Sequence, residues 1–106
     1  MGDTNLTLQP TIEQMEDYRT SIDNLDAALI AILAERFRLT EKIGRAKALA
    51  GFEPMDPERE RRQLERFRTL SSAHNLDVNV ALDVMTRIIQ HVKNRHEVLQ
   101  RSSSVS

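Results

Sequence analysis

The sequence predicts an all-α fold from three observations. Glycine and proline are scarce, with three of each, and aromatic residues make up only 4% of the chain, a composition that favours helices over sheets. Apolar residues recur every three or four positions through most of the chain, which is the period of one face of a helix. These stretches are bounded by residues that cap helices. For a chain of 106 residues we therefore expect one domain of three helices, the first much the longest.

The first predicted helix runs from Thr11 or Ile12 to Ala50. Thr11 and Gln14 fit a capping box, in which each side chain accepts a hydrogen bond from the other residue's backbone N–H, and Gly51 suits the position that ends a helix. The apolar seam keeps a 3-4 spacing for about five heptads, with one interruption at position 36. Its residues are Met15, Tyr18, Ile22, Leu25, Leu29, Ile32, Leu39, Ile43, Ala46 and Ala50.

The second and third predicted helices follow a short loop. Asp56 and Pro57 suit the N-cap and the first turn of the second helix, which ends near His74 and Asn75. Asp77 caps the third helix. The apolar positions of the third helix, with His96 on the same side, are Val78, Ala81, Met85, Ile88, Val92 and Leu99.

The length of the first helix predicts a homodimer. Residues 12–50 would form a rod about 58 Å long, whereas a compact domain of about 100 residues has a radius of gyration near 13 Å. One copy cannot cover both ends of the seam, but a second copy laid antiparallel can. We therefore expect a two-fold dimer whose long helices bury each other's seams. A plain coiled-coil tether would show the same periodicity.

The chain ends suggest the bounds of the domain, and the composition excludes several classes of protein. We expect residues 1–10 to be a flexible leader, residues 11–101 to form the domain and residues 102–106 to be a disordered tail. The chain has no cysteine and a formal net charge of −1, so neither thiolate chemistry nor a general attraction to nucleic acid or membranes is expected. Without an apolar span or a secretory signal, the expected location is the cytoplasm.

Two cations break the pattern of the first helix. Arg36 falls on the apolar seam, where a buried guanidinium is costly unless it is paired. Lys47 follows eleven residues later, almost three whole turns, so both side chains project along one face, roughly 16 Å apart. That separation can bracket a small dianion. An ion pair of Arg36 with an acid from another helix, and a solvated Lys47, are the alternatives.

Arg19 and Glu60 are the next candidates. Arg19 precedes Arg36 by seventeen residues, which places it about 100° around the helix and roughly 25 Å away. It can therefore complete only the site of a second, antiparallel chain. Glu60 shares a face with Leu64 and Phe67, where its carboxylate can accept from a substrate hydroxyl or hold a cationic neighbour.

The third helix carries two histidines. His91 and His96 are five residues apart, not the four that place two metal ligands on one helix face, so no metal site is expected. His96 takes the place of an apolar residue and is either a satisfied interior group or a member of a site.

The order and spacing of these residues form one set. Its segments are Tyr-Arg19-x-x-Ile-Asp-x-Leu-Asp26, Leu-Ala-Glu-Arg36, Ile-Gly-x-x-Lys47 and Asp56-Pro-x-Arg59-Glu60. Over about residues 15–100 the set resembles the all-helical chorismate mutases. The resemblance implies a three-helix protomer in an intertwined six-helix homodimer, without cofactor or metal. It also implies the reaction, the rearrangement of chorismate to prephenate towards phenylalanine and tyrosine.

By resemblance, three cations hold the substrate. Arg36 and the second chain's Arg19 hold the two carboxylates of chorismate, and Lys47 donates to the ether oxygen as its bond breaks. The pericyclic reaction needs no nucleophile or proton transfer. It needs an extended dianion held in a folded geometry and a donor where negative charge grows.

The resemblance implies further contacts on the other two helices. Glu60 accepts from the substrate hydroxyl, with Asp56 and Arg59 supporting the site. On the third helix the sequence departs from the family, because many members carry glutamine where His96 stands and serine where Val92 stands. Val92 cannot hydrogen-bond, whereas His96 can still donate an N–H to the ether oxygen.

Two other functions remain open. An isochorismate-pyruvate lyase shares the helical scaffold and makes salicylate, although the charged segment from Gly51 to Glu60 favours the mutases. A non-enzymatic helical dimerisation module predicts that Arg36 and Lys47 tolerate replacement by alanine.

Overall fold

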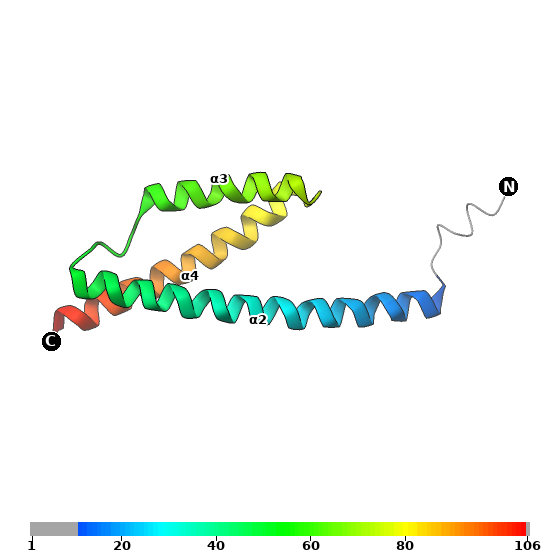
Figure 1. The fold of residues 1–106 in the computed structure, drawn as a ribbon, viewed down its shortest axis with the longest axis horizontal. Coiled ribbons are helices and arrows are strands. Elements are labelled where there is room, and N and C mark those ends of the chain that lie inside the picture. The colour runs from blue at the N-terminus through cyan, green and yellow to red at the C-terminus, as the bar shows by residue number, and fades with distance from the viewer. Residues whose placement is uncertain (1–10, 106) are drawn as a thin grey trace. The chain divides into compact units, whose positions relative to one another are not determined.

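The computed structural model describes residues 11–105, and side chains for residues 11–103. It contains α2 (Ile12–Ala50), α3 (Pro57–Ala73) and α4 (Val78–Val105), and the described residues form no strand (Figure 1). The all-α prediction of three helices is confirmed. The expected leader at residues 1–10 lies outside the described residues. None of the described helices combines the length and the apolar composition of a membrane span.

The ends of α2 follow the predicted capping chemistry. The backbone N–H of Gln14 donates to Thr11 Oγ1 at 3.1 Å, and the N–H of Thr11 donates to Gln14 Oε1 at 2.8 Å, so both halves of the capping box are present. Gly51 has a φ of 74°, and the N–H of Phe52 donates to the Lys47 carbonyl at 2.9 Å. This is the left-handed stop that glycine permits at low cost.

The ends of α3 are also capped as predicted. Asp56 Oδ1 accepts from the backbone N–H of Arg59 at 3.1 Å, and Pro57 stands in the first turn. At the other end Asn75 adopts a φ of 55°, and the N–H of Leu76 donates to the Ser71 carbonyl at 2.9 Å. Asparagine tolerates the left-handed conformation better than most residues, so it ends α3 as Gly51 ends α2.

Helix α4 is longer than predicted. It begins after Asp77, whose Oδ1 accepts from the N–H of Asn79 at 2.8 Å, and continues through Val105. The structure gives residues 102–105 as the end of this helix, where the sequence analysis expected a tail over residues 102–106. The helix end is held against α2, because Ser103 Oγ donates to the Ala48 carbonyl at 3.5 Å.

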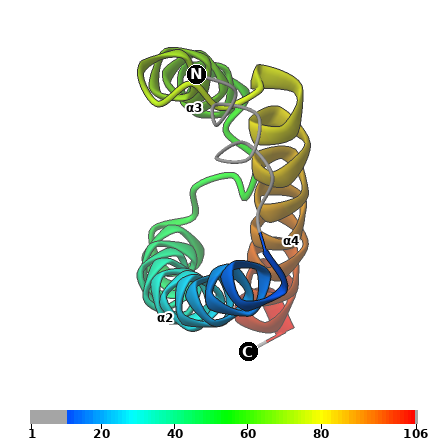
Figure 2. The same cartoon turned by 90° about the vertical axis from the view of Figure 1, so that its right-hand side faces the viewer.

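The chain divides into two units, Met1–Arg36 and Phe37–Ser106. In the second unit, α4 leaves the turn after α3 and passes the C-terminal part of α2 (Figures 1 and 2). Its buried apolar residues are Ile88, Ile89 and Leu99. The approach to α2 is close at Gly44, where an added Cβ would lie 2.9 Å from Leu99 Cδ1 and 2.5 Å from His96 Cδ2. Only glycine fits that contact without displacing α4.

The first unit, over residues 11–36, consists of the N-terminal part of α2. Eight of its large apolar side chains are between 41% and 82% exposed, Leu33 is partly buried, and none is fully buried within the described chain. The eight comprise the upstream seam and two further residues, Ile12 and Ile30: Ile12, Met15, Tyr18, Ile22, Leu25, Leu29, Ile30 and Ile32. A helix that exposes such a row in water needs another apolar surface against it.

Candidate active site

Lys47 stands in the last turn of α2 and is partly buried. Its carbonyl takes part in the helix stop. Its ammonium group makes no hydrogen bond or ion pair to any residue that the structure describes. A cation at a helix C-terminus is favoured by the helix dipole. The position of Lys47 fits both alternatives, a solvated ammonium and one that meets an anion.

His96 is buried, with 6% of its surface exposed. Its Nε2 lies 2.8 Å from the carbonyl oxygen of Thr40. A carbonyl oxygen only accepts, so Nε2 carries a proton and donates it to α2. A neutral ring then has a lone pair at Nδ1, and Nδ1 becomes a second donor only when the ring is charged. His96 is thus a satisfied interior group through one nitrogen, and any donation to a substrate falls to the other.

Thr40 and Gly44 place the His96 ring one helical turn before Lys47. The ring bonds the Thr40 carbonyl and lies against Gly44, which precedes Lys47 by three residues. Side chains three residues apart on a helix are neighbours. His96 therefore contacts the stretch of α2 that leads to Lys47.

An ion pair fastens α4 to α2 beside this stretch. Arg95 donates to Glu41 from Nε at 2.7 Å and from Nη2 at 2.8 Å. The hydrogen bonds from Arg95, aided by its positive charge, hold the pKa of the Glu41 carboxyl below its ordinary value and raise the pKa of the Arg95 guanidinium. This bidentate ion pair orients α4 relative to α2 at the residue next to His96.

Glu60 occupies the first turn of α3 and is paired across the helices. Its Oε1 lies 3.4 Å from Lys93 Nζ on α4, and both side chains are about three-quarters buried, with 26% and 24% of their surfaces exposed. Of the two alternatives for Glu60, a cationic neighbour is therefore present. The sequence analysis missed Lys93, although Ile89, Lys93 and His96 follow a helical spacing beside the apolar positions of α4.

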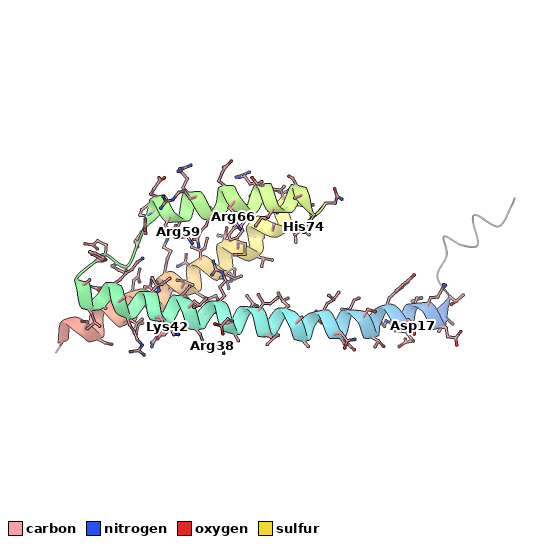
Figure 3. All side chains as sticks on the ribbon, viewed as in Figure 1. Asp17, Arg38, Lys42, Arg59, Arg66 and His74 are labelled. Carbon is pink, nitrogen blue, oxygen red and sulfur yellow. The ribbon has the colours of Figure 1, made fainter. Side chains whose placement is uncertain are left out.

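The other expected residues of the second unit are less enclosed. Asp56 uses one carboxylate oxygen to cap α3, and Arg59 lies exposed in the first turn of that helix (Figure 3). Val92 is partly buried and offers no polar group to a ligand. Four arginines of α3 are exposed: Arg61, Arg62, Arg66 and Arg68.

Arg19 and Arg36 belong to the first unit. Arg19 is exposed, and its Nη1 donates to Glu16 Oε1 at 2.8 Å in a surface pair within the helix. Such exposed pairs contribute little to stability, so Glu16 can yield Arg19 to a stronger anion. Arg36 is partly buried and interacts with another group of the chain.

An open depression of about 340 Å³ lies between the ends of α2 and α4, and it includes none of the expected site residues. It is lined by Arg45, Ala48, Leu49, Leu99, Ser102 and Ser103. Over the described range, no three acidic or histidine side chains gather so as to hold a metal ion.

These features define a small all-helical protein in which α4 contacts the C-terminal part of α2. Comparison with known proteins gives the same class. The model of the family described as chorismate mutase type II matches residues 18–97. The chorismate mutase of Methanocaldococcus jannaschii is 33% identical over 82 residues, which cover 77% of this chain and 83% of that protein.

Longer proteins contain a similar segment. The bifunctional chorismate mutase/prephenate dehydratase of Escherichia coli K12 is 42% identical over 72 residues, covering 68% of this chain and 19% of that protein. The T-protein of Haemophilus influenzae is 30% identical over 79 residues, covering 74% of this chain and 21% of that protein. The chain thus spans about a fifth of these relatives and most of the archaeal one.

The chain therefore belongs to the chorismate mutase type II family. It is an isomerase, and its reaction is the rearrangement of chorismate to prephenate.

Proposed function

We propose that the chain performs this rearrangement as a two-fold homodimer, with Lys47 as the main donor to the transition state. The observation that carries the proposal is the partly buried Lys47 ammonium, which has no partner among the described residues. Breaking the ether bond of chorismate puts negative charge on its oxygen. A cation placed there beforehand stabilises the transition state more than the ground state.

The two substrate carboxylates require two further cations. Arg36 precedes Lys47 by almost three turns of α2, so their spacing suits the two ends of a small dianion. Arg19 is exposed and weakly paired, and we assign the second carboxylate to Arg19 of the partner subunit. The planar guanidinium group of arginine can form a bidentate pair with a carboxylate.

Glu60 and His96 complete the proposed site. Glu60 accepts from the substrate hydroxyl, with Asp56 and Arg59 at the start of the same helix in supporting positions. His96 directs Nδ1 to the ether oxygen, because Nε2 is engaged by Thr40. If His96 donates there, it does so as the charged ring, since the neutral ring has only a lone pair at Nδ1.

Orientation and charge together are sufficient for this chemistry. An acceleration of about a million-fold corresponds to about 8 kcal/mol of barrier. Holding the dianion in its folded geometry and placing donors at the ether oxygen are each able to contribute several kcal/mol. The mechanism uses no cofactor, metal or covalent intermediate.

A second copy of the chain is the proposed cover for the exposed apolar row of residues 12–36. Two antiparallel copies of α2 would bury both rows at once, since a two-fold axis sets the same surface against itself. The cytoplasmic location expected from the sequence stays a prediction.

The direct test is turnover by the purified protein. Loss of chorismate absorbance with formation of prephenate is the expected result, and a solution mass near twice 12.2 kDa is expected for the active species. Isochorismate is supplied in parallel. Salicylate fluorescence from isochorismate, without chorismate turnover, would instead identify a lyase. No turnover of either substrate, and no rise in melting temperature with a chorismate-like dianion, would leave a dimerisation module.

A further inference from the structure

Lys93 lies on the buried side of α4, where a lysine is unusual. Ile89, four residues earlier, and His96, three residues later, are both buried. These spacings put the three side chains on one face of the helix. Only 24% of the Lys93 side chain is exposed. Lysine is rarely buried to this degree unless its charge is paired, so the pairing of Lys93 accounts for its place in the fold.

The partner of Lys93 is the acid that the proposed mechanism uses. Lys93 Nζ lies 3.4 Å from Glu60 Oε1. Helices α3 and α4 diverge as they leave the turn at residues 74–77 (Figure 1), and Glu60 stands at the far end of α3 from that turn. Two long side chains therefore bridge the helices where backbone contact between them is no longer close.

The pairing leaves part of Glu60 available. No other side-chain partner of Glu60 is present among the described residues. The separation of 3.4 Å is longer than the roughly 2.8 Å of a tight charge-assisted hydrogen bond. The ammonium thus compensates the charge of Glu60 and limits its side-chain freedom through Oε1. The other oxygen, Oε2, remains able to accept from a hydroxyl.

We propose that Lys93 is a positioning residue for Glu60, holding it as an oriented carboxylate that receives the hydroxyl of the substrate. This inference rests on the proposed role of Glu60. Without the cation, a carboxylate with only 26% of its surface exposed would be left without compensation for its charge. It would then turn towards water. That change removes the acceptor from the substrate.

The test is a double-mutant cycle measured by chorismate turnover. Lys93→Met keeps the length of the side chain and removes its charge, and we expect kcat/KM to fall about ten-fold, the size of coupling seen between contacting residues. In a Glu60→Gln background the same Lys93→Met change should cost less than two-fold. Lys93→Arg should restore most of the activity. Lys42→Met, on an exposed lysine of α2 labelled in Figure 3, is the matched control and should change nothing.

The outcomes separate this inference from the proposed function. If the wild-type chain lacks chorismate turnover, the proposed function fails. If the wild type is active and Lys93→Met matches it, or loses the same factor with and without Glu60, the positioning role is wrong. Melting temperatures of all variants are recorded. Should Lys93→Met not fold, Lys93→Gln replaces it in the same cycle, and the same additive result would reject the proposal.

Discussion

The two parts of α2 carry the same apolar period and differ in what lies against them. Over residues 12–36 all the large apolar side chains except Leu33 are at least 41% exposed. From residue 37 onward α4 lies against the helix, and Gly44 is buried. The periodicity of a sequence therefore identifies which face of a helix is apolar. It does not say whether the same chain or another one covers that face.

The face of α2 that contacts α4 is not the predicted seam. Leu39 and Ile43 of the seam remain 50% and 51% exposed, while Thr40 and Gly44 on the neighbouring line meet His96. Ile30, exposed in the first unit, lies on the upstream continuation of that second line. Before Ile30 that second line is polar, with Asp26, Asp23 and Arg19, so the predicted seam is the apolar line that stays exposed in both parts of α2. This exposed seam is the main support for the proposed second chain.

The largest loss of activity is expected on replacing Lys47, the cation in the C-terminal part of α2 that has no partner among the described residues. Lys47→Ala should lower kcat by about a hundred- to a thousand-fold, the usual cost of removing one preorganised donor to a developing oxyanion. KM should change much less, since the contact strengthens in the transition state. Steady-state kinetics on chorismate measure both. Lys42→Ala removes an exposed lysine of the same helix and should leave kcat unaltered. Equal turnover for the Lys47→Ala protein and the wild type would remove Lys47 from its role.

The next prediction tests whether a second copy of the chain covers the exposed apolar seam of residues 12–36. Leu25→Lys places a charge in the middle of the seam, and an unpaired charge buried between two helices costs several kcal/mol. The dimer should therefore dissociate, which sedimentation would report as a mass near 12.2 kDa. Ala31→Lys, on an exposed position away from both apolar lines, is the control and should remain dimeric. A dimer that survives Leu25→Lys unchanged would require another interface.

The third prediction tests whether Arg19 of one chain and Arg36 of the other belong to the same site. Arg19→Ala and Arg36→Ala proteins should each be nearly inactive, because each loses a carboxylate contact in every site. When the two are mixed and allowed to exchange subunits, half of the dimers are mixed and each of these has one intact site. Activity should then recover to about a quarter of the wild type, as two-fold symmetry requires. No recovery in a mixture shown to have exchanged would contradict a shared site.

The sequence was sufficient for the helices and for part of the site. Caps at Thr11, Asp56 and Asp77 and the stop at Gly51 act locally, so their hydrogen bonds follow from neighbouring residues alone. The contact of Glu60 with Lys93 depends on how α3 and α4 diverge, which no local pattern encodes.

Because local patterns do not encode contacts between helices, the sequence also left open the role of His96 and the length of α4. The bond from His96 Nε2 to Thr40 depends on a close helix crossing, so the sequence left open which nitrogen faces a substrate. Residues 102–105 read as a tail because serine-rich ends are weak helix formers. The contact of Ser103 with the Ala48 carbonyl accompanies the extension of α4, and tertiary packing commonly overrides propensity in this way.

The smallest effect is expected for the Glu41–Arg95 ion pair, which joins α4 to the C-terminal part of α2. The hydrogen bonds from Arg95 hold the pKa of Glu41 below its ordinary value. The folded state is thus stabilised while Glu41 is charged, and this contribution is lost as the pH falls through the lowered pKa. Glu41→Gln should show a modest loss in the denaturation midpoint at pH 7 and a shallower decline between about pH 5 and pH 3 than the wild type.

Glu58 provides the matched control for this prediction. Its pKa is also lowered, by hydrogen bonds from Arg61, but both residues lie exposed on α3 three positions apart. Such a pair stabilises one turn of helix and joins nothing else. Glu58→Gln should therefore shift the midpoint less than Glu41→Gln at pH 7. Equal shifts would mean that the Glu41–Arg95 pair adds nothing to the packing of α4 on α2, and that the buried contacts around Gly44 and His96 hold the two helices together by themselves.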